Sequence, residues 1–287
     1  MKQDAGVILV NVLVALALGA AIIVLMFTSQ ENLMDRTRRA AAVTQAQALA
    51  LGAEASILVA LRRDMIDAPE GDHFAERWAQ AAQDEVVLAT GKFSITLSDA
   101  RGRFDLNSLS LGGLAQQQIF ARLSTTIGLS DRAALTISQH LVQRGSVRNL
   151  SEIDGLDPAD RDMLKPYVSL LTTRRPLNVN TAEETVLAAV LGSVSSARQL
   201  IKLRARNGFL TKADLAEAGV VVLNGVGFTS DVFDVTSTAE VDATTVVLSS
   251  RIIRNTKLGK HEALVVARRF GVPVDLRHAN TQSFASQ

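Results

Sequence analysis

Cysteine is absent from this chain of 287 residues. Disulfide bonds and thiolate metal sites are therefore excluded, and the redox compartment cannot be inferred from cysteine usage. An excess of charge is absent too, because 30 basic side chains stand against 29 acidic ones. Without a strong net field to steer a polyanion, a dedicated nucleic-acid-binding protein is not favoured, although a local basic face remains possible.

Catalytic motifs are also missing. The sequence contains no H-E-x-x-H, no G-x-S-x-G and no Walker loop. Gly225-Val226-Gly227 is too short for a nucleotide-binding fingerprint, and we expect a loop there. The histidines are scattered, with no two at metal-ligand spacing: His73, His140, His261 and His278. We therefore expect no enzymatic activity.

Two groups of aspartates leave alternatives open. Asp154, Asp157 and Asp160 lie three residues apart, and Asp99 and Asp105 flank a predicted hairpin turn. Such oxygen-rich groups would suit Ca²⁺ rather than a transition metal. The favoured interpretation of the first group is a set of helix-capping acids around Pro158.

One long apolar run dominates the N-terminus. From Val7 to Phe27 the only strongly polar residue is Asn11. As a helix this run would span roughly 31 Å, which matches the hydrocarbon core of a bilayer. A cleaved secretory signal is the alternative, but its apolar core is usually shorter. We therefore expect a membrane-spanning helix.

The orientation of this span is ambiguous from charge. Lys2 precedes the span, whereas Arg36, Arg38 and Arg39 follow it. The positive-inside rule alone would place the C-terminal side in the cytoplasm.

The helix is expected to continue beyond the membrane. No proline occurs between Ser29 and Asp67, and Gly52 is the one helix breaker in this stretch. The composition favours a single helix that ends near Ala68-Pro69. Its apolar positions are Leu33, Ala40, Val43, Leu51, Ile57, Leu58 and Leu61.

Strand patterns begin after this helix. An apolar run at 85–89 precedes an alternation at Phe93, Ile95 and Leu97, which predicts a hairpin or small meander. The predicted turn is 99–102, after which Phe104 and Leu106 resume the alternation. Further strands are predicted at 232–235 and 244–253, followed by a last helix at Glu262–Phe270.

Short helices are predicted between these strand regions, from residue 108 to about residue 218. Their N-caps are predicted at Ser130, at Asn149 or Ser151, and at Thr181, which has Glu184 three residues on. A single sheet interrupted by an inserted helical domain explains the order most economically. Two separate sheets are the alternative, but each would have too few strands to be stable alone. The predicted fold class is therefore α+β.

Three stretches resemble a known family. Gly6 followed by an apolar helix resembles the type IV pilin-like subunits, in which a prepilin peptidase cleaves directly after such a glycine. The resemblance implies a mature chain that starts at Val7. The fifth mature residue is usually glutamate but is Asn11 here, and the K-type pseudopilins of type II secretion characteristically lack that glutamate.

The other two stretches also resemble the K-type family. They are SDARGRFDLNSLS at 98–110 and RPLNVNTAEETVLAAVLG at 175–192, which is followed by FLTKADL at 209–215. N-V-N-T-A is the most specific part of the resemblance. The implied fold is a pilin-like long helix packed on a small antiparallel sheet, interrupted by an all-α domain similar to SAM or helix-hairpin-helix modules.

The resemblance implies these boundaries: a prepilin leader at 1–6, a transmembrane part of the helix at 7–28 and its extramembrane part at 29–67, a pilin-like α/β domain at 84–107 and 230–270, and an inserted helical domain of two subdomains at 108–220.

The implied function is that of a minor pseudopilin of the bacterial inner membrane, with its bulk in the periplasm. In this family the K-type subunit caps the tip of a short pseudopilus together with the minor pseudopilins I and J. The implied partners also include the prepilin peptidase and the inner-membrane secretion platform, whereas no nucleic acid is expected. Calcium is bound in the globular part of some members, but no ligand set can be carried over residue by residue.

Two alternatives remain. The run at 178–218 is also similar in layout to the helix-hairpin-helix modules of membrane-anchored DNA-uptake receptors. In that reading the basic residues would face phosphates, but the second glycine of the hairpin is missing at 192–195, and a solvated helix face is simpler. These basic residues are Arg198, Lys202, Arg204, Arg206 and Lys212. The other alternative is a single-span protein whose soluble domain binds another membrane component.

Overall fold

One helix dominates the structure. The computed structural model describes residues 4–173, 175–220, 225–257 and 259–271. Helix α1 (Asp4–Asp67) has 64 residues and is roughly 96 Å long at 1.5 Å per residue. The predicted continuity of this helix is confirmed. It ends just before Ala68-Pro69 because a proline disfavours helical backbone in the residue before it.

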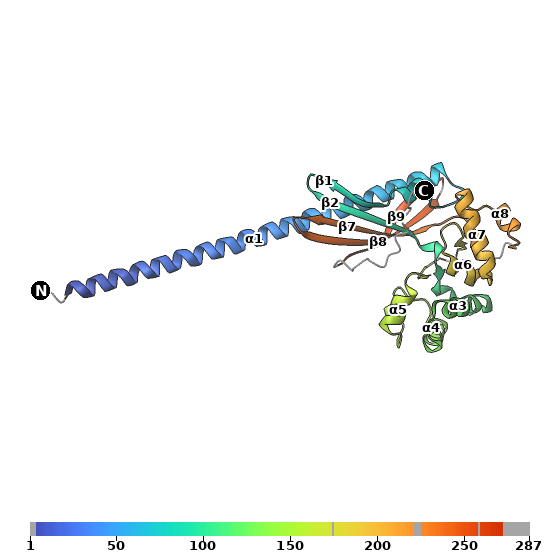
Figure 1. Cartoon of the computed structure of the whole chain (residues 1–287), viewed down its shortest axis with the longest axis horizontal. Coiled ribbons are helices and arrows are strands. Elements are labelled where there is room, and N and C mark those ends of the chain that lie inside the picture. The colour runs from blue at the N-terminus through green and yellow to red at the C-terminus, as the bar shows by residue number, and fades with distance from the viewer. Residues whose placement is uncertain (1–3, 174, 221–224, 258, 272–287) are drawn as a thin grey trace.

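The two halves of α1 have different environments. Its N-terminal half projects alone from the folded body (Figure 1), and nearly all side chains from Leu9 to Ala41 are exposed. In the second half, one face is buried at intervals of three or four residues, as the helical period requires. This buried stripe consists of Ala42, Ala46, Ala50, Ala53, Ile57 and Leu61. Four of the six are alanines, and because these side chains are small, the helix backbone lies close to the surface against which it packs.

That surface is a five-stranded antiparallel sheet in the order β1-β2-β7-β8-β9. Its strands are β1 (Gln83–Leu88), β2 (Gly91–Asp99), β7 (Val232–Val241), β8 (Thr244–Lys257) and β9 (Lys260–Gly271). The short helix α2 (Arg77–Gln80) adds Trp78, whose ring meets Phe233 edge-on at 5.0 Å. A long N-terminal helix on an antiparallel sheet was the predicted frame, and it is confirmed.

The predicted last helix at Glu262–Phe270 is wrong. These residues belong to β9, which pairs with β8 along its whole length. Ala263 is buried and Val265 half-buried, while Leu264 between them is exposed, so the period is that of a strand. Gly259, with φ +74°, makes the turn that folds β9 back onto β8.

The predicted hairpin turn at 99–102 is also misplaced. The tight turn of the hairpin lies at residues 89–90, between β1 and β2. Residues Ala100–Gly102 instead form a 3₁₀ turn that leads the chain out of the sheet. The next strand, β3 (Phe104–Asp105), pairs in parallel with β4 (Val168–Ser169) and not with β2. Asp99 and Asp105 therefore do not flank a hairpin turn.

The chain between β2 and β7 is mostly helical. Its helices are α3 (Leu114–Ile127), α4 (Asp131–Arg144), α5 (Pro158–Leu164), α6 (Glu184–Leu191), α7 (Val194–Asn207) and α8 (Lys212–Glu217). They share one apolar core, which extends from Phe104 to Val226. Two short 3₁₀ helices, Leu106–Leu111 and Leu150–Glu152, complete the segment. These elements gather at the end of the molecule remote from the N-terminus (Figure 1).

Four local predictions can be compared with this segment. Ser130 caps α4, because its hydroxyl accepts from the main-chain N–H of Ala133, and Asn149 caps the second 3₁₀ helix. Thr181 caps no helix, since α6 begins at Glu184 with Glu183 as its N-cap. Gly225-Val226-Gly227 is not simply a loop, because strand β6 (Val226–Gly227) pairs in parallel with β5 (Leu177–Asn178).

Candidate functional site

The N-V-N-T-A segment lies at the junction between the sheet and the helical segment. The Asn178 side chain is fully buried. Its Nδ2 donates to the carbonyl of Asp72 at 2.9 Å, to Oγ of Ser230 at 2.9 Å and to Oδ2 of Asp99 at 3.1 Å. Its Oδ1 accepts from the main-chain N–H of Asn180. One amide therefore joins the chain that follows α1, the end of β2 and the chain entering β7.

Asp99 is the acceptor at the centre of this junction. Its carboxylate accepts from the main-chain N–H of Arg101 at 2.7 Å, from the hydroxyl of Thr181 at 2.5 Å and from the hydroxyl of Ser230. Burial raises the pKa of Asp99, whereas the hydrogen bonds from Ser230 and Thr181 oppose that rise. Thr181 therefore stabilises the contact between the helical segment and the sheet, and not the start of a helix.

Glycine is required where the two motifs meet. A Cβ on Gly102 would lie 2.8 Å from Oγ1 of Thr181 and 2.9 Å from its main-chain carbon. The S-D-A-R-G motif and the N-V-N-T-A motif, which are far apart in the sequence, thus pack directly on each other. The most specific residues of the sequence resemblance form a structural junction.

The second asparagine of the motif stabilises the helical segment itself. Asn180 bridges the turn before α8, since its Oδ1 accepts from the N–H of Leu210 at 2.6 Å and its Nδ2 donates to the carbonyl of the same residue. Arg204 donates to the carbonyls of Val179 and Ala182, and burial lowers its pKa. Arg204 is therefore not part of a solvated helix face, whereas Arg198, Lys202 and Arg206 are exposed.

Arginine side chains also join the sheet to the helical segment. Arg101 has an exposed fraction of 1%, and its Nε donates to Asp231 at 2.7 Å. Arg103 and Arg251 both pair with Asp234, at 2.5 and 2.7 Å. These guanidinium groups lower the pKa of Asp234 although its burial opposes them.

A cluster of buried acids lies at the C-terminal end of α1. Asp64, Asp72 and Glu76 each place a carboxylate oxygen within 4.8 Å of the others. Arg254 from β8 donates to Asp64 at 2.7 Å and also to Asp72. A single guanidinium therefore faces three carboxylates.

Burial and the excess of negative charge shift the pKa values of the acids in this cluster. Burial raises the pKa of Asp64 to about 7, the charge of Glu76 adds to the rise, and Arg254 opposes it. Burial likewise raises the pKa of Glu76 and lowers that of the neighbouring His73.

This acidic cluster does not fit calcium. Calcium takes six to eight oxygen ligands. Here the oxygens already accept hydrogen bonds, Asp72 from Ser230 N–H at 2.5 Å and Glu76 from Trp78 Nε1 at 2.7 Å, in addition to those from Arg254.

The acids considered from the sequence lie elsewhere. Asp154 and Asp157 are exposed, and the first pairs with Arg144. Asp157 stands at the N-cap of α5, before Pro158, without a side-chain cap bond. Within the described residues, Asp154, Asp157 and Asp160 do not converge in a metal-type group.

The histidines and the processing residues can be placed in part. His73 stacks on Phe209 at 4.7 Å, and His278 lies outside the described residues. The backbone of Gly6 and Val7 belongs to α1, and Asn11 is exposed on the projecting half. The roles assigned to these three residues stay predictions.

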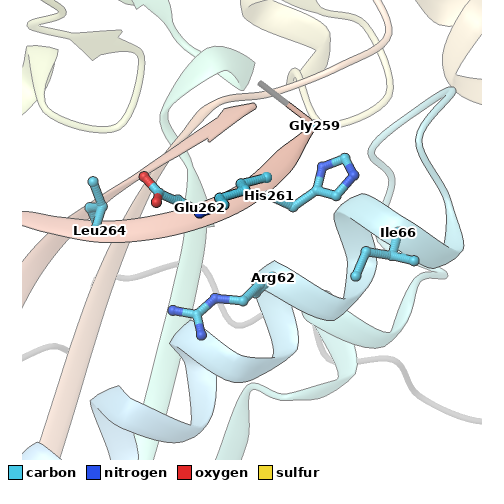
Figure 2. Close-up of a pocket in the computed structure, with 7 residues that line it drawn as sticks. Arg62, Ile66, Gly259, His261, Glu262 and Leu264 are labelled. Carbon is cyan, nitrogen blue, oxygen red and sulfur yellow. The ribbon is translucent and has the colours of Figure 1, made fainter. Parts of the chain in front are cut away.

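Two clefts open on the folded body. We call the first the arginine cleft; it has a volume of about 480 Å³ and is lined by Arg101, Arg103, Arg122 and Arg175. The second, of about 540 Å³, is shallow and lies between the last turns of α1 and the β8–β9 hairpin. Figure 2 shows Arg62 and Ile66 of α1 on one side of it and His261 of β9 on the other.

One helix among the described residues is long and apolar enough to cross a membrane. It is α1, whose most apolar window has a mean hydropathy of 2.8 and is not buried in the folded body.

Comparisons with known proteins point in one direction. The family model of the type II secretion system protein K matches residues 177–236. Type II secretion system protein K of Pseudomonas aeruginosa is 28% identical over 74% of this chain and 76% of its own length. The protein of the same name from Klebsiella pneumoniae is 27% identical over 74% of this chain and 78% of its own length.

A solved structure shares the fold. It is a chain of the GspK–GspI–GspJ complex from the type 2 secretion system of enterotoxigenic Escherichia coli, with a TM-score of 0.63 and 19% identity, over 83% of this chain and all of that one. The relatives carry the names of secretion components and not of enzymes. The matched region contains the N-V-N-T-A residues that form the junction, and the resemblance seen in the sequence is confirmed: this chain is similar to the type II secretion system protein K family.

Proposed function

We propose that this protein is a K-type minor pseudopilin that caps the tip of a pseudopilus together with minor pseudopilins of the I and J types, and that it thereby supports protein export across the outer membrane. The observation that carries the proposal is the match to protein K relatives over most of the chain. An exposed apolar half-helix on a pilin-like sheet supports it, because such a helix needs lipid or neighbouring subunits around it.

The chain is proposed to span the inner membrane once, with its C-terminal part in the periplasm. Prepilin peptidase would cleave after Gly6, so that Val7 becomes the first residue. Coexpression with a prepilin peptidase and intact-mass spectrometry test this step. The expected mature mass starts at Val7, and Gly6→Val is expected to leave the leader attached. An intact Met1 on the wild-type chain, or a start near Ile22, would refute the proposal.

Asn11 is proposed to mark the tip position. The resemblance to pilin-like subunits implies that, in a pilin stack, the carboxylate usual at this position pairs with the N-terminal amine of the subunit above. A subunit with no neighbour above has no such partner, and a neutral amide costs less in lipid than an unpaired carboxylate.

The partners can be tested by copurification. The full chain, coexpressed with the I- and J-type pseudopilins of the same bacterium and extracted in a nonionic detergent, is expected to purify with both. Recovery of the chain without either partner would contradict the proposal. The inner-membrane secretion platform is the further partner proposed.

We also propose that residues 108–220 form a domain of two subdomains inserted into the pilin-like part at 84–107 and 230–270. The pairing of Asp99 with Phe233 supports this, because the two ends of the insertion leave and re-enter neighbouring strands. Replacement of residues 102–230 by a short glycine-rich linker is expected to leave a folded helix-and-sheet unit, detectable by circular dichroism.

DNA uptake finds no support among the relatives, whose names refer to secretion. Arg204, one of the basic residues considered for phosphate contact, donates to internal carbonyls and is not available to DNA.

A further inference from the structure

The arginine cleft is built from parts of the chain that the junction brings together. Arg101 and Arg103 come from the chain next to the end of β2, and Arg122 comes from α3. Arg175 comes from the segment before β5. The volume of about 480 Å³ falls within the range typical of ligand-binding clefts.

Cations outnumber anions around the cleft. Asp231 is shared, because Nε of Arg101 lies 2.7 Å and Nε of Arg175 lies 2.9 Å from its two carboxylate oxygens. Asp234 is shared in the same way by Arg103 and Arg251.

Arg122, the remaining arginine of the cleft, has only a main-chain hydrogen-bond partner among the described residues. Nε of Arg122 donates to the carbonyl of Ala189 at 2.8 Å, and no carboxylate of the described residues is paired with its guanidinium. Asp105 is the one acid in the cleft wall, and its carboxylate already accepts from the N–H of Leu171 and of Asn107.

The guanidinium groups of Arg122 and Arg175 are accessible to solvent. Arg122 is exposed, and the Arg175 side chain has an exposed fraction of 58%. Arginine presents a planar fork of N–H donors that matches a carboxylate. Two such forks at one cleft, with fewer carboxylates than guanidiniums around them, make a receptor for an added anion.

The walls of the cleft between these arginines are partly apolar. Phe104, Ile119, Leu177 and Val190 line it, so a ligand with apolar groups beside its anions fits better than a polyphosphate.

We propose that the arginine cleft binds an acidic peptide segment of a partner protein, with a carboxylate on Arg122, a second on Arg175, and an apolar side chain between them. The residues that line the cleft belong to α3 and to the segments around β3 and β5, which lie at the end of the molecule remote from the N-terminus (Figure 1), so a partner can approach them away from the projecting half of α1. The proposal goes beyond a role in the pseudopilus and stands on the chemistry of the cleft alone.

Calorimetric titration of the full chain in a nonionic detergent tests this. The probe is a blocked hexapeptide of alternating aspartate and leucine, and its counterpart with asparagine is the neutral control. We expect saturable binding of the acidic peptide that weakens as salt is added. We expect Arg122→Gln and Arg175→Gln each to weaken it about tenfold, the loss typical of one charge-assisted hydrogen bond.

Matched variants separate this site from general charge. Arg132→Gln and Arg206→Gln remove exposed arginines of the same helical segment and are expected to leave the affinity unchanged. Thermal unfolding of each variant checks that its fold is retained. Equal binding of the neutral peptide, an equal loss in the control variants, or no binding at all would overturn the proposal. Tighter binding of a hexathymidine oligonucleotide at the same arginines would replace it by a nucleic-acid site.

Discussion

Asp64, near the C-terminal end of α1, makes the stability of the folded chain depend on pH. Its pKa is raised from 3.8 to about 7, so between these values the folded chain keeps a proton that the unfolded chain has lost. The free energy of unfolding therefore falls as the pH rises through this window, because the folded state must give up a proton it holds more tightly.

The Asp64→Asn variant tests this linkage. An amide cannot ionise, so the difference in unfolding free energy between about pH 5 and about pH 8 is expected to shrink by roughly 3 kcal/mol relative to the wild type. Thermal or urea unfolding of the full chain at both pH values measures it. Asp67→Asn, on the same helix but half exposed, is the matched control for the loss of a carboxylate. An unchanged slope in Asp64→Asn would contradict the raised pKa.

Ala243 stores strain in the turn between β7 and β8. It has φ +61° and its neighbour Asp242 has φ +46°, the backbone of a type I′ turn that favours glycine at the second central position. Ala243 is exposed, so a substitution changes little besides the backbone. Ala243→Gly is expected to raise the free energy of unfolding by about 1 kcal/mol, measured by urea denaturation. A loss of stability would show that this turn has another conformation.

At the scale of elements, the contact of α1 with the sheet depends on small side chains. Ala46 is fully buried and lies in a cluster with Val241, Val246 and Leu248. Ala46→Leu should lower the free energy of unfolding by about 1–3 kcal/mol because the larger side chain must push helix and sheet apart. Ala48→Leu is exposed on the same turn and serves as the control, with a change near zero. Equal stability of the two variants would mean that the contact is loose.

The sequence predicted the elements better than their partners. The long helix was predictable because no proline interrupts it, and the central strands because Phe93, Ile95 and Leu97 alternate with polar residues. The helix predicted after Gly259 is wrong. Ala, Leu, Val and Arg occur in both helices and strands, so only the pairing with β8 decides that this segment is a strand. The buried alanine stripe could not be predicted either, because alanines such as Ala46 and Ala50 are common on every face of a helix and do not by themselves indicate a core.

The junction was less predictable still. Thr181 has the local pattern of a capping box, yet its hydroxyl donates to Asp99, a residue distant in the sequence. Local pattern carries no information about such a partner. The one usable signal was that two unusual polar motifs, at 98–110 and 175–192, occur in the same chain.

At the scale of the whole molecule, Asn178 holds the helical segment to the sheet. Asn178→Ala would leave the buried carboxylate of Asp99 with one donor fewer and would orphan the carbonyl of Asp72. We expect the free energy of unfolding to fall by about 3 kcal/mol, together with faster proteolysis between the two parts. Thermal unfolding and limited proteolysis measure these effects. Asn207 is an exposed asparagine of α7, and Asn207→Ala should change the free energy of unfolding by only a few tenths of a kcal/mol. A similar loss in both variants would show that Asn178 has no special role.

The pairing of β2 with β7 has a consequence for the order in which the chain can fold. Asp99 pairs with Phe233 where β2 ends and β7 begins, so the whole chain between these residues must be synthesised before that pair can form. Closing so long a loop is entropically costly unless the intervening chain is already compact. The helical segment has its own apolar core and can shorten that distance by condensing first. The sheet is therefore completed late, and a chain emerging N-terminus first presents β1 and β2 as an open edge until β7 arrives.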